Sequence, residues 1–266
     1  MTPPPVSVGV SLKMYFGHQE ARDWFSRVAD IVRAPSSAGD AIRNGDVEFF
    51  VIPGYLAIES ALEAFDGTRV LVGAQDVATA DSGAFTGEVS GTELAEIGVR
   101  LAEVGHAERR RLYGETELVV AEKTAAALRN GLAPLLCVGE PEPTGVEHAI
   151  RHCVEQVRTA LDGSSDGRII VAYEPTWAIG AERSAPPEHV REVVRGLRTA
   201  MRSLPGREGT SIIYGGGAGP GTLPTLVPEI DGLFLGRFAH DPLAVAAVLE
   251  EASRLAAPGA RRESDG

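Results

Sequence analysis

Short, strongly apolar runs recur along the chain, and a longer amphipathic stretch follows each of them. Phe49-Phe50-Val51-Ile52 and Ile169-Ile170-Val171-Ala172 are typical, because they are apolar at every position and do not alternate with polar residues. Strands that are covered on both faces of a parallel sheet have this pattern. The strands predicted in this way are Val6–Ser11, Val47–Ile52, Val70–Ala74, Arg100–Val104, Ala133–Val138, Ile169–Tyr173, Ser211–Tyr214 and Gly232–Leu235.

The stretches between these strands are predicted to be helices. The clearest begins near Thr116, a favourable N-cap, carries Glu117 in its first turn and stops at Gly131. Eight strand–helix units with no linker between them predict an α/β protein, a single-domain (β/α)8 barrel over residues 6–252. Residues 1–5 and the tail 253–266 have little to bury, so we expect both to be disordered.

Charge and cysteine content exclude several classes of protein. The formal net charge of −12 argues against non-specific binding to nucleic acid or to an anionic membrane. Cys137 and Cys153 form no CxxC pair, which argues against a disulfide framework or a structural zinc site. The N-terminus resembles no secretory leader, and no segment approaches the ~20 apolar residues that span a bilayer. We therefore expect a cytoplasmic protein without a nucleic-acid or membrane partner.

In a (β/α)8 barrel the chemistry lies where the strands end, and three such ends carry reactive side chains. Lys13 follows the first strand, where it would face solvent or an anion. His106 follows the fourth strand just before a possible helix, whose N-terminus would keep its imidazole neutral. Glu174 ends the sixth strand, where burial would raise its pKa into the range of a general base. The ordinary alternatives are a surface lysine, a structural histidine and a capping glutamate.

Glycines and a proline follow the later strands. Pro175 gives a rigid hinge after Glu174, and Gly180 begins a flexible tip, as in a lid that closes over a substrate. The run Gly215–Gly219 follows the seventh strand and Gly236 the eighth. Glycines at these places let backbone N–H groups approach a phosphate closely. The sequence therefore predicts a phosphate site at the last two strand ends.

These residues occur in strings that resemble the triosephosphate isomerase family. His106 with Glu108-Arg109-Arg110 is similar to its G-H-[SA]-E-R-R signature, and Ala172–Gly180 to its A-Y-E-P-[VT]-W-A-I-G segment. Further strings that match in order are Gly73–Asp76, Gly83–Ser90, Leu136–Glu140 and Tyr214–Gly216, and the resemblance runs from about Val6 to Leu249. It implies a TIM barrel that interconverts an aldose phosphate and a ketose phosphate, with no metal and no organic cofactor.

The resemblance also implies a role for each catalytic position. Glu174 looks like the base that moves a proton between adjacent carbons, and neutral His106 like the group that polarises the carbonyl. Lys13 looks like the cation that attracts a phosphorylated sugar, with Glu108 as a supporting carboxylate nearby. The implied substrate-binding positions are Ser11, Gly180, Tyr214, Gly216, Gly217, Gly236 and Arg237.

Two further structural features are implied by the same resemblance. Tyr214 would latch the closed lid through the backbone of Ala185. The loop from Gln75 to Ser90, with Phe85 at its apolar tip, would insert into a second subunit, and Thr86 would reach the active site there. The resemblance therefore implies a homodimer.

Several positions depart from the family pattern, and most of them lie close to the expected substrate. The motif N-W-K-M-N is here Ser11-Leu12-Lys13-Met14-Tyr15, the lid tip G-T-G-K-T-A is Gly180–Ala185, and G-G after the last strand is Gly236-Arg237. Gly217 replaces a serine. Two substrates stay open: the triose phosphates, glyceraldehyde 3-phosphate and dihydroxyacetone phosphate, and L-erythrulose 1-phosphate, which divergent members use.

Three other readings compete with an isomerase. A dinucleotide-binding enzyme is disfavoured, because no register of the glycine run reads G-x-G-x-x-G. A metalloenzyme would need a third ligand beside His148 and His152, which lie four residues apart in a probable helix. A catalytically silent paralogue with a binding or regulatory role is disfavoured by the intact Lys13, His106 and Glu174.

Overall fold

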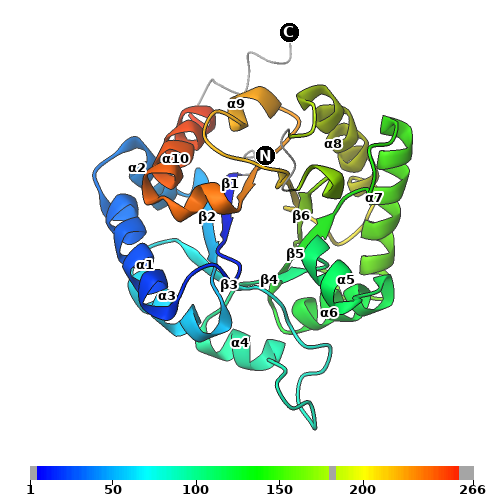
Figure 1. Ribbon diagram of the computed structural model, residues 1–266, viewed down its shortest axis with the longest axis horizontal. Helices are drawn as coiled ribbons and strands as arrows, with labels where there is room; N and C mark the ends of the chain where they lie inside the picture. Colours follow the sequence, from blue (N-terminus) through cyan, green and yellow to red (C-terminus); the bar gives the residue numbers. More distant parts are fainter. Residues whose placement is uncertain (1–4, 180–183, 258–266) are drawn as a thin grey trace.

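Eight parallel strands close into a barrel in the order of the chain, as the computed structural model of the protein reveals (Figure 1). The structure describes residues 5–179 and 184–257. The strands are β1 Val6–Ser11, β2 Val47–Ile52, β3 Leu71–Ala74, β4 Leu101–Val104, β5 Ala133–Val138, β6 Ile170–Tyr173, β7 Ser211–Tyr214 and β8 Gly232–Leu235. The predicted barrel and its strands are confirmed, except that β3, β4 and β6 each begin one residue later than expected.

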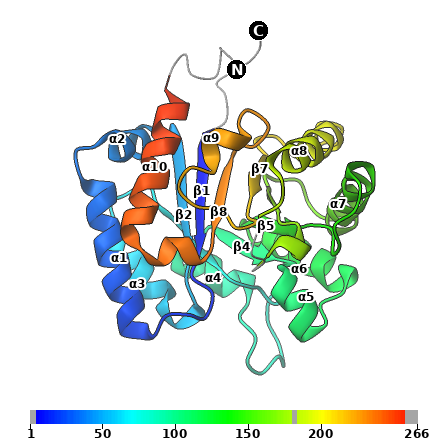
Figure 2. The same cartoon turned by 45° about the horizontal axis from the view of Figure 1, so that its top comes forward.

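Helices surround the strands on the outside of the barrel (Figures 1 and 2). They are α1 His18–Arg33, α2 Ser37–Asn44, α3 Ile58–Ala64, α4 Gly91–Ile97, α5 Ala107–Tyr113, α6 Glu117–Arg129, α7 Val146–Leu161, α8 Pro187–Met201, α9 Leu223–Leu226 and α10 Pro242–Ala256. Short 3-10 turns are η1 Tyr55–Ala57, η2 Thr176–Ala178 and η3 Arg237–His240. No helix in the described ranges is long and apolar enough to cross a membrane.

Two helix ends show how local sequence sets the boundaries. The hydroxyl of Thr116 accepts a hydrogen bond from the Val119 N–H, so the predicted N-cap of α6 is confirmed. Helix α10 continues to Ala256, which corrects the expected start of a disordered tail at residue 253. The helix continues because Leu255 and Ala256 pack against the hydrophobic core.

The barrel has an outer core, between strands and helices, and an inner core along its axis. Side chains alternate between the two along each strand. The inner core consists of Phe50, Ile52, Leu101, Leu135, Cys137, Ile170, Ala172, Ile213 and Phe234. By the same alternation, polar residues cap this apolar plug at both ends. Ser7, Glu48 and Arg168 lie at the amino ends of the strands, and Ser11, Glu103 and Glu174 lie at the carboxyl ends.

The connection between β3 and α4 projects away from the barrel body (Figures 1 and 2). It spans residues 75–90, and positions 81–88 are all exposed. Phe85 lies in this exposed part with 52% of its surface accessible, although a large aromatic side chain gains nothing from contact with water.

Candidate active site

Lys13 leaves the end of β1 with a strained backbone. Its φ of +50° lies in the left-handed region that non-glycine residues rarely adopt. The Gln75 side chain donates to the Lys13 carbonyl over 2.9 Å and holds this turn. The Lys13 ammonium donates to Glu108 Oε1 over 2.7 Å. Burial lowers the pKa of Lys13, but the hydrogen bond and charge of Glu108 outweigh it, so the pKa is raised and the ammonium is permanent.

His106 caps the N-terminus of α5, and this contact fixes its tautomer. Its Nδ1 accepts the Glu108 backbone N–H at 3.1 Å, so the neutral ring carries its proton on Nε2. Burial lowers the pKa of His106 to about 4, and the charge of Lys13 acts in the same direction. The imidazole is therefore a neutral hydrogen-bond donor at physiological pH. Its neutrality was predicted from the helix terminus, whereas burial is the largest cause.

Glu174 stands at the end of β6 with one carboxylate oxygen free. The side chain is buried, and its Oε2 has no hydrogen-bond partner in the described part of the chain. This oxygen lies 3.6 Å from His106 Nε2. Burial, together with the charge of the nearby Glu103 carboxylate, raises the pKa of Glu174 to about 8. A carboxylate with such a pKa is a strong base near neutral pH.

Two glycines make room for Glu174. A Cβ on Gly215 would lie 2.4 Å from Glu174 Oε1, and a Cβ on Gly139 would lie 1.8 Å from its carbonyl oxygen. Any other residue at either position would push the carboxylate out of place. The sequence prediction assigned no such role to these two glycines.

The segment after Glu174 is anchored on Glu140 at the end of β5. The indole of Trp177 donates to Glu140 Oε1 over 2.8 Å, and the hydroxyl of Tyr173 also donates to this carboxylate. The Thr176 N–H donates to the Glu140 carbonyl. Pro175 and the turn η2 are thereby fixed to the barrel, so the base stands on a rigid support.

Glu103 is a site residue that the sequence prediction missed. It lies on β4 at the inner face, and it is 3% exposed. The Ser11 hydroxyl donates to its Oε2 over 3.0 Å, while its Oε1 lies 3.9 Å from His106 Nε2. Burial raises the pKa of Glu103 to about 7. The available signal was a carboxylate within the apolar strand Leu101–Val104, which a buried strand does not carry without a reason.

The predicted phosphate positions lie at the ends of β7 and β8, and their roles stay predictions. Gly216 is buried and Gly217 is exposed with φ +80°, a backbone conformation that favours glycine. Tyr214 donates its hydroxyl to the Gly216 carbonyl, and the Ala185 backbone also contacts this hydroxyl. Arg237 is exposed on η3, directly after the half-buried Gly236. Gly180 lies outside the described residues.

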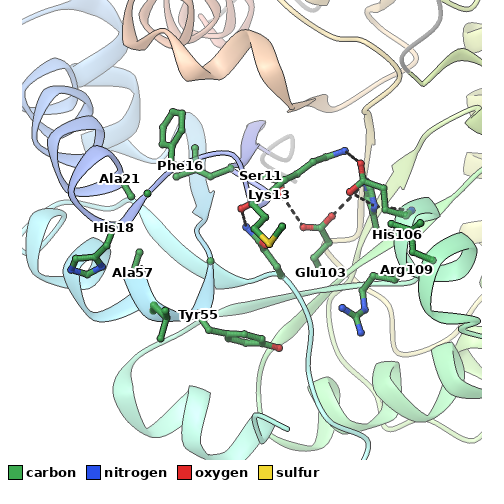
Figure 3. Close-up of a pocket in the computed structure, with 18 of the residues that line it drawn as sticks. Ser11, Lys13, Phe16, His18, Ala21, Tyr55, Ala57, Glu103, His106 and Arg109 are labelled. Carbon is green, nitrogen blue, oxygen red and sulfur yellow. Dashed lines mark hydrogen bonds and ion pairs between the residues drawn. The ribbon is translucent and has the colours of Figure 1, made fainter. Parts of the chain in front are cut away.

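A cavity of about 520 Å³ opens beside these groups. Figure 3 shows Glu103 between Ser11 and His106, with the Lys13 side chain extended across the same space. The outer part of the cavity is lined by Met14, Leu56 and Tyr113, which are large, mainly apolar and exposed. The volume suits a small ligand. Glu174 does not line this cavity; it borders a separate small cleft together with Gly105 and Gly139.

The remaining sequence candidates lie apart from this cavity or at its edge. Gln75, expected in the dimer loop, supports the Lys13 turn within the same subunit. Phe85 and Thr86 lie in the exposed part of that loop. His148 and His152 sit on α7 in the outer ring, away from the strand ends.

These groups suit one kind of reaction. A neutral hydrogen-bond donor and a permanent cation line one cavity, and a base lies 3.6 Å from the donor. Such an arrangement can remove a proton beside a carbonyl group and stabilise the negative charge that develops on oxygen. This chemistry defines the intramolecular oxidoreductases that interconvert aldoses and ketoses.

The family model described as "Triosephosphate isomerase" matches residues 6–252, and the chain belongs to this family of isomerases. It is 45% identical to L-erythrulose-1-phosphate isomerase of Pectobacterium atrosepticum over 96% of this chain and 98% of that protein. It is 36% identical to triosephosphate isomerase of Moorella thermoacetica over 92% of this chain and 97% of that protein. L-erythrulose-1-phosphate isomerase of Rhizobium etli is 38% identical over 88% of this chain and 87% of that protein. The chain is therefore an enzyme, an isomerase that acts on phosphorylated short-chain sugars.

Proposed function

We propose that this isomerase prefers L-erythrulose 1-phosphate to the triose phosphates. The single observation that carries the proposal is the polar pair formed by Ser11 and Glu103 beside His106. The serine is short, and its hydroxyl is turned to Glu103, which leaves space next to the reacting carbons. A relative with 45% identity bears the name L-erythrulose-1-phosphate isomerase, in agreement with this reading.

The proton transfer follows from the geometry of Glu174 and His106. With the phosphate on C1 and the carbonyl on C2, Glu174 removes the proton from C3, and His106 Nε2–H donates to the developing oxyanion. The proton of the C3 hydroxyl passes to the C2 oxygen, and Glu174 returns the carbon-bound proton to C2. The carbonyl is then at C3 and the hydroxyl at C2. Substrate and product are isomers, so no oxidant or reductant is needed. With the tetrulose both are ketoses, whereas the same step on dihydroxyacetone phosphate gives an aldose.

The phosphate and the lysine supply binding energy away from the reacting carbons. Lys13 keeps its charge in the cavity and attracts the dianionic substrate, while the glycines after β7 and β8 offer backbone N–H groups to the phosphate. Binding energy from the phosphate can then stabilise the transition state.

The two cysteines are free and buried, which fits the cytoplasmic setting that the sequence predicts.

The test is a comparison of kcat/KM for L-erythrulose 1-phosphate and dihydroxyacetone phosphate. Deuterium uptake from D2O, followed by proton NMR, measures both reactions, including the one whose product is also a ketose. We expect a ratio above about ten in favour of the tetrulose. Ser11→Asn should lower that ratio by about ten- to a hundredfold, because it refills the space. A ratio well below one for the wild type refutes the preference.

We infer further that the enzyme is a homodimer. Met14 is 96% exposed and Leu56 is 91% exposed, and both line the outer part of the active-site cavity. Large apolar side chains gathered at such a place favour coverage by a partner. The exposed loop that carries Phe85 and Thr86 projects from the barrel and has an apolar tip, which suits insertion into such a place on a second copy. Sedimentation of an active monomer at micromolar concentration would contradict the inference.

A further inference from the structure

Glu103 is a buried carboxylate that lines the cavity, and it has no role in the proton transfer described above. Ser11 donates to its Oε2, but its Oε1 receives no hydrogen bond from the described residues. His106 Nε2 is 3.9 Å from that oxygen, beyond hydrogen-bond range. Burying a carboxylate with so few partners costs free energy. Since Glu174 supplies the base, the free oxygen of Glu103 requires another explanation.

We propose that Glu103, held in place by Ser11, is the specificity-determining residue that pairs with the terminal C4 hydroxyl of a four-carbon ketose phosphate. This inference rests on the proposed preference for a tetrulose. Glu103 would recognise the C4 hydroxyl, which a triose phosphate lacks.

The distances allow this contact while the reacting carbon stays in place. C3 must lie beside Glu174 Oε2 and His106 Nε2, in contact with both, and these two atoms are 3.6 Å apart. Glu103 Oε1 is 3.9 Å from the same Nε2. The C4 hydroxyl is two bonds from C3, and each bond is about 1.5 Å long. The hydroxyl can therefore reach hydrogen-bond distance from Glu103 without moving C3 away from the base.

The chemistry of the pair suits a hydroxyl. Burial raises the pKa of Glu103 to about 7, so the carboxylate and the carboxylic acid are both populated near neutral pH. A hydroxyl donates to the first and accepts from the second. Because Ser11 occupies Oε2, the rotamer of Glu103 is fixed and Oε1 faces the cavity.

The same pair selects against three-carbon substrates. When dihydroxyacetone phosphate binds, Oε1 would be cut off from water without gaining a partner, which is costly for a charged group. Its charge would also repel the enediolate that forms next to His106. A site built to pair with a hydroxyl discriminates strongly against a substrate that lacks it.

The test combines three substrates with one substitution. The substrates are L-erythrulose 1-phosphate, its 4-deoxy analogue and dihydroxyacetone phosphate, and the variant is Glu103→Leu, an apolar side chain that removes the hydrogen-bonding oxygens. We expect the wild type to prefer the parent tetrulose over the 4-deoxy analogue by about a hundredfold or more in kcat/KM. In Glu103→Leu this preference should fall below about tenfold. The kcat/KM for dihydroxyacetone phosphate should rise rather than fall, because the unpaired buried charge is gone.

Glu48→Gln is the matched control, because Glu48 is another carboxylate of the barrel interior but lies at the opposite end. In Glu48→Gln the kcat/KM for each of the three substrates should stay within about threefold of wild type. A parallel loss on all three substrates in Glu103→Leu would overturn the proposal, because it would place Glu103 in the proton-transfer machinery or the fold. If Glu103→Leu fails to fold, Glu103→Gln keeps the shape and should still lower the preference at least about tenfold.

Two outcomes separate this inference from the function on which it rests. A wild type that prefers tetrulose to triose, yet uses the 4-deoxy analogue as well as the parent, refutes the role of Glu103 and leaves the proposed function intact. A wild type that prefers dihydroxyacetone phosphate refutes both.

Discussion

Both ends of the barrel interior carry a serine that donates to a glutamate, but the glutamates differ in their other hydrogen-bond partners. At the amino ends of the strands, Ser7 donates to Glu48, and Arg168 donates to both oxygens of Glu48 over 2.6 and 2.5 Å. At the carboxyl ends, Ser11 donates to Glu103, but no arginine of the described residues donates to that carboxylate. Glu103 keeps one oxygen without a donor among the described residues, and Glu174 does too.

The paired glutamate at the amino ends contributes to stability, whereas the glutamates at the carboxyl ends are available for chemistry. A carboxylate in a bidentate pair with arginine is satisfied, and it has no capacity left for a substrate. The carboxylates at the other end are buried without such a partner, and burial raises the pKa of Glu103 to about 7 and that of Glu174 to about 8. Their unmet hydrogen bonds cost stability, and the same groups are free to bind and to move protons.

The largest expected effect comes from removing the base at the carboxyl end. Glu174→Gln should lower kcat by about a thousandfold or more, because the amide cannot accept the proton. Steady-state kinetics measure the loss, and circular dichroism checks that the fold is kept. Turnover within tenfold of wild type would remove Glu174 from this role.

The matching change at the amino end should act on stability. Glu48→Gln leaves Arg168 with a weaker, neutral partner and should lower the free energy of unfolding by about 1–3 kcal/mol. Activity should stay within about threefold of wild type, because no substrate approaches this end. Urea unfolding at fixed protein concentration measures the change. A loss of activity without a loss of stability would contradict the assignment of Glu48 to stability alone.

The unpaired carboxylates predict a pH dependence of stability. Their folded pKa values, about 7 for Glu103 and about 8 for Glu174, lie above the ordinary value for glutamate. Their contribution is fully present below about pH 4.5 and is lost as the pH rises through 7 to 8. The free energy of unfolding should therefore fall by at least about 1 kcal/mol over this window.

Unfolding curves measured from pH 5 to 9 test this dependence. The double substitution Glu103→Gln with Glu174→Gln should flatten the profile, whereas Glu48→Gln should leave its slope unchanged. A wild-type profile that rises over the same range has the wrong sign for raised carboxylate pKa values.

The smallest effect is spectroscopic. His106 should stay neutral from pH 8 down to about pH 5, since its pKa is lowered to about 4. Nitrogen-15 NMR of the labelled protein should find the proton on Nε2, because Nδ1 accepts the Glu108 N–H. His148, exposed on the outer ring, serves as the internal reference. A proton on Nδ1 would disprove the assigned tautomer.

Much of the molecule follows from the sequence alone. Apolar runs without alternation indicate strands covered on both faces, and eight of them separated by helices favour a closed parallel barrel, which the structure confirms. Lys13, His106 and Glu174 were predicted as the reactive groups because each follows a buried strand at the end where this fold carries its chemistry. These inferences depend on local sequence patterns and on the rules by which parallel strands are connected, and both can be read from the order of the residues.

Other features depend on which strands become neighbours across the barrel. Glu103 is far from Ser11 in sequence, and only closure of the barrel brings its carboxylate to the serine hydroxyl and the imidazole. The fit of Gly139 and Gly215 around Glu174 likewise depends on strands packed at close range. The raised pKa values of the two glutamates have the same origin, because burial and the approach of like charges exist only in the folded barrel.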